Sequence, residues 1–191
     1  GVEFNPEKAR ALLAQAGFPG GKGFPRLELM TTSREVQKTM AEAIQGMWKR
    51  HLGVHVDIRS CEWTAYKFAQ NSMQYDFSSS SWSGDYLDPS SFLDLWSSAS
   101  GNNNTGWSRP EYERLLAESR ATGDQEKRMA LLARAEALML SESPVIPLYW
   151  ARRSYLKSPE VRGWHPLLLD NHLFEDISLG APREQGKEAA P

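Results

Sequence analysis

The sequence lacks most of the features that mark a membrane protein or a disulfide-stabilised domain. It has a single cysteine, Cys61, which cannot form an internal disulfide and which we expect to be a buried, inert thiol at a strand end. No apolar run approaches the roughly 18 residues that a membrane-spanning helix needs. The first residues, GVEFNPEK, show neither the charged nor the apolar region of a signal peptide.

The sequence also lacks an excess of charge of one sign and the common catalytic motifs. A net charge of −2 with no Lys/Arg block leaves no footprint for nucleic acid or for a membrane surface. The histidines are dispersed, no HExxH motif or cysteine cluster suggests a metal, and no G-x-S-x-G elbow surrounds the serines near position 80. The sequence therefore predicts no metal, no cofactor and no enzyme of these types.

One enzymatic alternative stays open. Asp76, Asp85, Asp88 and Asp94 lie close together in the sequence and could supply the carboxylate pair of a glycoside hydrolase, with tryptophans as sugar platforms. However, Asp88 precedes a proline and is typical of a helix cap, and Asp94 falls on an expected helix. A carboxylate-based hydrolase is therefore the weaker hypothesis.

Helical and strand patterns alternate in the first part of the chain. Asn5-Pro6 is typical of a cap followed by proline at the first helical position, and Gly17 ends that helix. Residues 26–32 and 54–58 alternate as strands. Between them, Ser33 is expected to cap a long helix that ends at Gly53. Its predicted apolar stripe comprises Val36, Met40, Ile44, Met47 and Trp48. Strand, helix and strand in this order favour a parallel crossover unit.

The second part of the chain continues the alternation. A short helix is expected from Glu62 to about Asn71, followed by a buried strand at Phe77–Ser81. Helices then start at Pro110 and after Asp124, and strands are expected at Val145–Tyr149 and Leu173–Leu179. The helix at Pro110 would carry Tyr112, Leu115, Leu116 and Ser119. The fold class that follows is α/β, with a mixed, largely parallel sheet flanked by helices.

The stretch from Asp76 to Trp107 concentrates the chemistry. The strand at its start leads onto a turn with the sequence WSGDY, and Asp88-Pro89 then opens a short helix. An Asn- and Gly-rich loop at residues 101–106 follows, which is too polar for the core. Aromatic rings, a carboxylate and several amides thus meet at a strand end, where open α/β sheets place ligands.

The pattern WSGDYLDPSSFLDLW…GNNNTGW resembles the family 5 extracellular solute-binding proteins, the periplasmic oligopeptide- and dipeptide-binding components of ABC importers. The resemblance continues upstream in FNPEKARALLAQAGFPGGKGFP and AEAIQGMWKRHLGVHVDIRSCEW. It continues downstream in RPEYERLLAESR, SPVIPLYWARRSYLKS and VRGWHPLLLDNH. These segments follow the order of the family and cover nearly the whole chain except its end.

The resemblance implies one lobe of a periplasmic-binding-protein-like type II fold. Because family members are much longer, we expect the chain to be a fragment that matches their C-terminal part and lacks the N-terminal lobe. Residues 1–160 would form the solute-binding lobe, residues 161–179 a return segment toward the missing lobe, and residues 180–191 a disordered tail. The parent protein would be periplasmic or extracellular, with or without a lipid anchor. It would close on a peptide-like solute and present it to an ABC permease.

Asp85 is the first candidate for a ligand contact. The residue type alone favours a turn aspartate that caps the helix beginning at Pro89. The resemblance implies instead that its carboxylate receives the α-amino group of a peptide. Trp82 and Trp63 are candidate walls for an extended ligand, and the alternative is that both are core residues. Weaker candidates are Ser83, Tyr86 and Asn104. The Asn-rich loop could also be a solvated turn.

One departure from the family concerns the ligand's carboxylate. Members that bind oligopeptides place basic side chains at positions that here are Gln37, Gln70 and Ser79. Either a nearby arginine substitutes (Arg59, Arg152 or Arg153), or the missing lobe does, or the ligand has no free carboxylate there. A peptide-like solute is the expectation, and an oligosaccharide, a nickel chelate or haem are the alternatives within the same fold.

Overall fold

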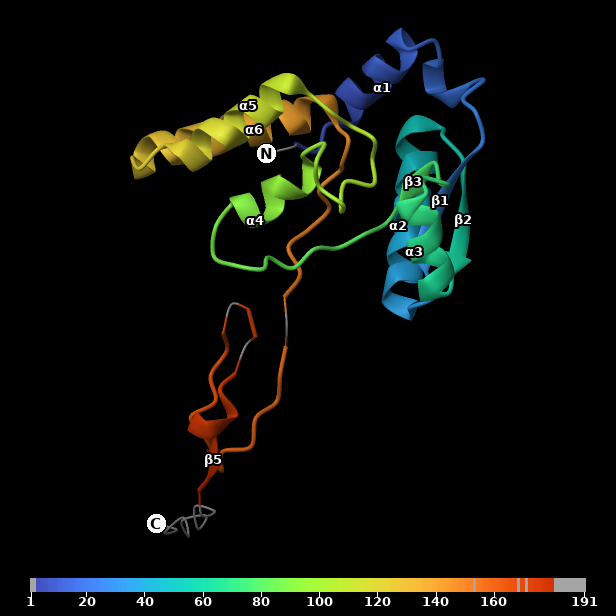
Figure 1. Ribbon diagram of the computed structural model, residues 1–191. Coiled ribbons are helices and arrows are strands. Elements are labelled where there is room, and N and C mark those ends of the chain that lie inside the picture. The colour runs from blue at the N-terminus through green and yellow to red at the C-terminus, as the bar shows by residue number, and fades with distance from the viewer. Residues whose placement is uncertain (1–2, 153, 168, 171, 181–191) are drawn as a thin grey trace, which may run out of the picture.

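The computed structural model describes residues 3–152, 154–167, 169–170 and 172–180. These residues form two packed units and an arm that extends away from them (Figure 1). The tail expected at residues 180–191 therefore lies, apart from Gly180, outside the described residues. The elements are α1 (Pro6–Gln15), η1 (Pro19–Gly21), β1 (Leu27–Thr32), α2 (Glu35–Leu52), β2 (Val56–Cys61), α3 (Trp63–Asn71), β3 (Phe77–Ser78), α4 (Ser90–Leu93), η2 (Asp94–Trp96), α5 (Pro110–Ala121), α6 (Gln125–Glu142), β4 (Val161–Arg162), η3 (Phe174–Asp176) and β5 (Ser178–Leu179).

β1 is the middle strand of a parallel sheet with the order β2-β1-β3. It pairs with β2 from Leu27↔Val56 to Thr32↔Cys61, and with β3 over two residues. α2 connects β1 to β2 and contacts both strands. The crossover unit with parallel strands is thus confirmed.

Helices cover both faces of β1, because successive side chains of a strand point to opposite faces. Leu29 packs in one cluster with Ala41 of α2, whereas the neighbouring Met30 packs in another with Tyr66 and Ala69 of α3. Burial on both faces is typical of parallel strands. The predicted α/β class, with helices flanking the sheet, is confirmed.

The turn after α1 packs closely on the end of α2. Gly53 ends α2 in the left-handed conformation, with φ of 69°. A Cβ at Gly53 would lie 2.2 Å from the carbonyl oxygen of Gly20, so no larger residue fits there. The predicted helix end at Gly53 is confirmed, and the approach of the two backbones explains it.

Two details of α2 differ from the sequence prediction. Ser33 does not cap the helix; instead its backbone N–H donates to the carbonyl oxygen of Cys61 at 2.9 Å, beside the β1–β2 ladder. The predicted apolar stripe is buried only in part, because Val36 is 72% exposed and Met47 is 46% exposed.

Cys61, at the end of β2, is half-buried, whereas the sequence predicts a buried thiol there.

The predicted buried strand Phe77–Ser81 is wrong beyond its first residues. β3 contains only Phe77 and Ser78, and both are half-buried. The Ser79 N–H still donates to the Met30 carbonyl oxygen at 2.9 Å, after which the chain leaves the sheet and Ser81 is exposed. Serine side chains contribute little apolar area, so nothing holds the segment in the sheet.

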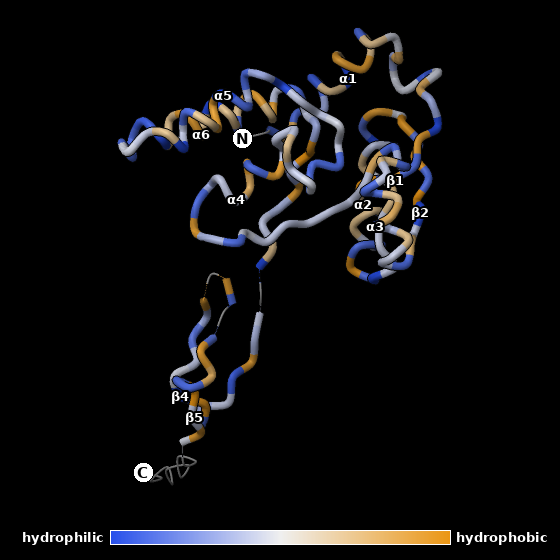
Figure 2. Tube along the Cα trace, in the orientation of Figure 1, coloured by the Kyte–Doolittle hydropathy of each residue, from blue (hydrophilic) through white to orange (hydrophobic). Residues whose placement is uncertain are grey.

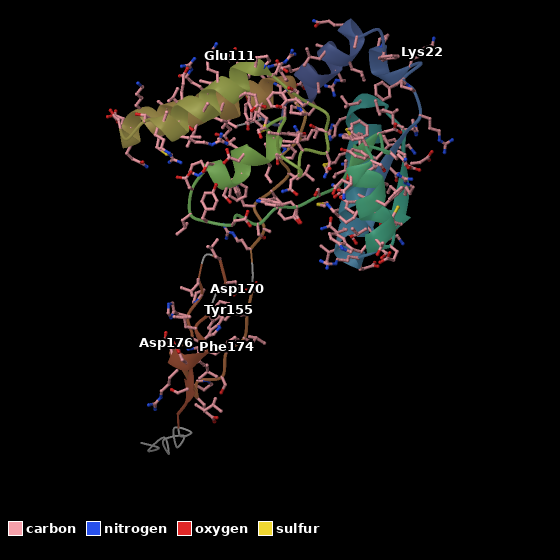
Figure 3. All side chains as sticks on the ribbon, in the orientation of Figure 1. Lys22, Glu111, Tyr155, Asp170, Phe174 and Asp176 are labelled. Atoms are coloured by element: carbon pink, nitrogen blue, oxygen red, sulfur yellow. The ribbon has the colours of Figure 1, made fainter. Side chains whose placement is uncertain are left out.

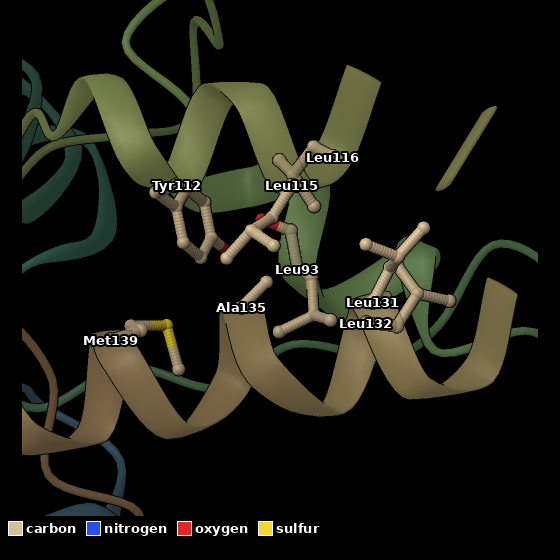
Figure 4. Close-up of a cluster of buried hydrophobic side chains, with 8 residues drawn as sticks. All are labelled: Leu93, Tyr112, Leu115, Leu116, Leu131, Leu132, Ala135 and Met139. Carbon is tan, nitrogen blue, oxygen red and sulfur yellow. The ribbon is translucent and has the colours of Figure 1, made fainter. Parts of the chain in front are cut away.

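α5 and α6 lie side by side and form the second unit together with α4 (Figures 1 and 4). Its core comprises Leu93, Tyr112, Leu115, Leu116, Leu131, Leu132, Ala135 and Met139. The predicted helix at Pro110 is confirmed, and the structure buries Tyr112, Leu115, Leu116 and Ser119 on it. The predicted cap of α6 is also confirmed, because the Asp124 carboxylate accepts a hydrogen bond from the Lys127 N–H at 3.1 Å.

The predicted buried strand Val145–Tyr149 is wrong. These residues form no strand, and Tyr149 is 62% exposed. From here the chain runs along the arm, which carries several apolar stretches (Figure 2). The predicted strand Leu173–Leu179 is shortened to β5, which pairs antiparallel with β4. Figure 3 places Tyr155 and Phe174 on this arm, away from both packed units.

The Tyr112 hydroxyl joins α5 to α4. Tyr112 is fully buried, and its hydroxyl donates to the Leu93 carbonyl oxygen at 2.6 Å. Tyr112→Phe keeps the ring beside Trp107 but leaves a buried carbonyl without its donor. We expect the free energy of unfolding, measured by urea denaturation, to fall by about 1–3 kcal/mol. Tyr155→Phe, at a 51% exposed ring of the arm, is the control, and equal losses in both variants would contradict this role of Tyr112.

Candidate functional site

A small pocket lies where the chain passes from β3 to α4. Its volume is about 150 Å³, and it is lined by Trp82, Asp85, Tyr86, Ser90, Ser91, Asp94, Leu95, Ser100 and Asn102. The lining combines two aromatic rings with carboxylates, hydroxyls and an amide. A second groove of about 380 Å³ lies on α2 and is lined mainly by Val36, Met40, Ala43 and Tyr149, with Glu35 and Thr39. Its surface is mostly apolar, so the first pocket is the one with groups for holding a charged solute.

The Asp85 carboxylate has no partner within the part of the chain that the structure describes. Asp85 is exposed, and its backbone N–H donates to Ser91 Oγ at 2.7 Å. The capping role that the sequence leaves open for Asp85 belongs to Asp88, whose Oδ1 accepts from the Ser90 N–H at 2.9 Å. Asp85 is therefore a charge held at the pocket without a structural task for its carboxylate.

The two aromatic rings of the pocket are fixed at their polar ends. Trp82 donates from Nε1 to the Ser91 carbonyl oxygen at 3.1 Å. The Tyr86 hydroxyl lies 3.2 Å from Ser90 Oγ. Trp82 is still 40% exposed and Tyr86 47% exposed. Neither ring is a core residue, so both keep surface that a solute can cover.

The remaining sequence candidates do not line this pocket. Trp63 begins α3 in the sheet unit and is 59% exposed. Its ring stacks on Tyr66 with a centroid distance of 5.9 Å and an interplanar angle of 17°. Ser83 is exposed, and the Asn104 carbonyl oxygen accepts from the Tyr75 hydroxyl. The structure thus brings Trp82, Asp85 and Tyr86 together and leaves Trp63, Ser83 and Asn104 outside.

The Asn-rich loop is organised mainly by one of its own amides. Asn103 Nδ2 donates to the carbonyl oxygens of Trp96, Ser97 and Trp107 at 3.1, 3.2 and 2.9 Å. The turn alternative therefore applies to Asn103. Asn102, rather than Asn104, lines the pocket.

The sequence patterns do not single out the residues that shape the loop. Ser90 and Ser91 are both buried, and they hold Tyr86, Asp85 and Trp82 in place. The only hint in the sequence is the pair of serines directly after Asp88-Pro89. If such serines are buried at a helix start, their hydroxyls need hydrogen-bond partners nearby. Gly84 allows close packing here, since a Cβ on it would lie 3.0 Å from the Phe92 ring.

Gln37, Gln70 and Ser79, the uncharged residues at positions where oligopeptide-binding relatives are expected to carry basic side chains, lie near one another in the sheet unit. Ser79 Oγ and Gln37 Oε1 are 3.3 Å apart, and the buried Gln70 donates to the Tyr66 hydroxyl at 3.1 Å. Arg59 is not available as a substitute basic side chain for a ligand carboxylate, because it pairs with Glu28 and donates to the Gln74 carbonyl oxygen. Arg153 lies outside the described residues.

Of the four aspartates that could serve a glycoside hydrolase, Asp85 and Asp94 line the same pocket. Asp76 accepts from the Glu28 N–H at 2.8 Å, Asp94 pairs with Arg120 at 2.7 Å, and Asp88 pairs with Arg128. Three of the four candidate aspartates thus have structural partners. Over the described ranges we also find no cluster of three or more His, Cys, Asp or Glu that could bind a metal, and no helix with the length and apolarity to cross a membrane.

A parallel α/β unit with a polar and aromatic pocket at a strand end is typical of small-solute-binding proteins. The comparison with protein families defines the group more closely. The family model described as "Bacterial extracellular solute-binding proteins, family 5 Middle" matches residues 1–104. The chain belongs to this family.

Individual relatives are named as binding proteins, not as enzymes. The oligopeptide-binding protein OppA of Bacillus subtilis (strain 168) is 34% identical over 152 residues, which is 79% of this chain and 28% of that protein. The probable deoxycholate-binding periplasmic protein YgiS of Escherichia coli (strain K12) is 34% identical over 156 residues, 82% of this chain and 29% of that protein. A crystal structure of a periplasmic oligopeptide-binding protein from Borrelia burgdorferi superimposes with a TM-score of 0.85 at 32% identity, covering 94% of this chain and 37% of the other. The chain thus spans less than a third of the length of these curated relatives.

The Asp88–Arg128 pair makes the loop sensitive to acid. Hydrogen bonds from Arg128 lower the pKa of Asp88 far below its ordinary value, although burial opposes this shift. The ion pair therefore contributes its full stabilisation at pH values above about 3.9, the pKa of an aspartate in the unfolded chain. This contribution is lost as the pH falls from there toward the folded pKa.

We therefore expect Asp88→Asn to lower the free energy of unfolding clearly at about pH 6, and the difference from wild type to shrink at about pH 2.5. Urea denaturation at both pH values measures it. Asp57→Asn is the control, because Asp57 pairs with Arg26 at the surface, where solvent weakens an ion pair. A deficit of Asp88→Asn that is the same at both pH values would contradict the assignment.

Proposed function

We propose that this chain is one lobe of the substrate-capture component of an ABC importer. Residues 1–160 form that lobe, and the whole protein closes two lobes on a peptide-like solute and presents the closed form to a membrane permease. Membership of family 5 supports the proposal, as do the names of relatives, which include oligopeptide-, dipeptide- and murein peptide-binding proteins. The similar protein from Borrelia burgdorferi is likewise described as belonging to an oligopeptide ABC transporter.

Asp85 is the observation that carries the proposal. An exposed carboxylate without a described partner lies beside two partly exposed rings, Trp82 and Tyr86, in one pocket. Such a carboxylate suits a positively charged group, which it would bind as a charge-assisted hydrogen bond. A peptide α-amino group is small enough for the pocket, and the rings would cover its first side chain without selecting a sequence.

The other candidates would contact the solute farther from its amino end. Trp63 offers a flat, 59% exposed indole at the start of α3, and Lys67 Nζ lies 5.9 Å from its ring centroid. Ser83 and Asn104 flank the pocket in sequence. We propose that these three residues face the cleft once the second lobe is present.

The arm would return the chain to the second lobe, with residues 161–179 as the connecting segment. Its apolar side chains support this role, because Leu173 and Leu179 are 66% and 78% exposed and would gain cover from another lobe. Since several relatives are named as periplasmic proteins, we place the whole protein in the periplasm or outside the cell, with or without a lipid anchor.

The isolated chain should bind peptides weakly, because it holds only half of the cleft. A tripeptide is titrated into the 191-residue chain, and NMR chemical shifts report the binding. We expect a dissociation constant near 1 mM, which corresponds to a binding free energy of about −4 kcal/mol. The shifts should be confined to the backbone of residues 82–86 and 90–91 and to the Trp82 indole N–H. A dissociation constant of about 1 µM would show that the cleft is not halved.

The Asp85 carboxylate should recognise the amine rather than the peptide as a whole. In the same titration we expect Asp85→Asn to weaken binding by at least about tenfold, the worth of one charge-assisted hydrogen bond. N-acetylation of the tripeptide should weaken it equally, with no further loss when the two changes are combined. Asp94→Asn is the matched control in the same pocket, because Asp94 is already paired with Arg120. The proposal would be contradicted if the acetylated peptide bound as tightly as the unmodified one. It would also be contradicted if the chain bound deoxycholate but no peptide.

A further inference from the structure

Arg128 lies on α6, outside the pocket, and makes a two-point ion pair with Asp88. Its Nη1 and Nη2 donate to Asp88 Oδ2 and Oδ1, both at 2.7 Å. The two side chains are only 21% and 22% exposed. A bidentate guanidinium–carboxylate pair fixes orientation as well as distance, so this contact attaches the backbone around Asp88 to α6 in one geometry.

Asp88 transmits this attachment to the start of α4. Its Oδ1 also accepts from the Ser90 N–H at 2.9 Å. Its carbonyl oxygen accepts from the Ser91 N–H at 3.1 Å, and its own N–H donates to the Tyr86 carbonyl oxygen at 2.9 Å. Asp88 is thus connected to α6 on one side and to both serines on the other.

The proposed solute contacts depend on those serines. Ser91 accepts the Asp85 N–H at its Oγ and the Trp82 indole N–H at its carbonyl oxygen, and Ser90 Oγ lies beside the Tyr86 hydroxyl. Within the described residues, every hydrogen bond of residues 80–87 ends on residues 86–91. Over this described part of the chain, the loop is therefore hydrogen-bonded to the second unit only at the start of α4, and not to α5, α6 or the sheet.

We infer that Arg128 is a positioning residue for the solute site: it places Asp85 and Trp82 by holding residues 88–91 on α6, without touching the solute. Only the link to solute binding rests on the proposed function; the placement of the loop by Arg128 does not. Tyr112 anchors the other end of α4 through Leu93, so loss of Arg128 should release the loop end of this segment and leave the helical core in place.

Amide hydrogen exchange of the 191-residue chain tests the placement without any ligand. We expect Arg128→Ala to speed exchange of the hydrogen-bonded amides of Asp85, Asp88, Ser90 and Ser91 about tenfold. Exchange in α5 and in the β1–β2 ladder should stay as in the wild type. Arg134→Ala is the matched control: Arg134 is exposed on the same helix and has no ion pair in the described part of the chain. Arg128→Lys keeps the charge but loses the two-point geometry and should lie between wild type and Arg128→Ala.

The peptide titration then links the placement to binding. Arg128→Ala should weaken tripeptide binding about as much as Asp85→Asn, and Arg134→Ala should leave it unchanged. Faster exchange throughout α5 and α6 would show a role in overall stability and would overturn the inference, as would unchanged exchange in the loop of both Arg128 variants. If the wild-type chain binds no peptide at any concentration, the proposed function fails, while the exchange result still decides whether Arg128 places the loop.

Discussion

The hydrogen bonds that Asp88 receives from Arg128 and from the Ser90 N–H are the constraint on which the site depends. A helix start needs an acceptor for its first N–H groups. Because Asp88 meets that need and is itself neutralised by Arg128, Asp85, three residues earlier, keeps a carboxylate without a structural task. The chain thus separates the charge that supports the loop from the charge that is available to a solute.

The two packed units contribute differently to this arrangement. The parallel sheet delivers the chain to the loop at Ser79, whose N–H is the last to donate to β1. The helical unit then receives it through Arg128 and Tyr112. Ligand pockets occur preferentially between packed units. The chain spans 28–30% of the length of two relatives, the oligopeptide- and dipeptide-binding proteins of Bacillus subtilis.

Most of the fold was predictable, because it rests on local signals. Asn5-Pro6, Gly53 and Asp124 mark helix ends by chemistry that acts within a few residues, and the β1 and β2 patterns follow from burial. The failures are at places where tertiary contacts decide. Val36 falls on the predicted apolar stripe of a helix but is 72% exposed. Residues 145–149 have the composition of a buried strand, yet no described strand lies beside them to supply hydrogen bonds. The roles of Ser91 and Arg128 required the coordinates, since their partners are distant in sequence or reached through the backbone.

The central claim is that the amino end of a solute lies against Asp85. Intermolecular nuclear Overhauser effects between the first residue of a tripeptide and the chain, recorded near saturation, test it most directly. We expect contacts from the peptide's N-terminal residue to the Trp82 and Tyr86 ring protons. Contacts only to Val36, Met40 and Ala43, which line the apolar groove of α2, would contradict the claim.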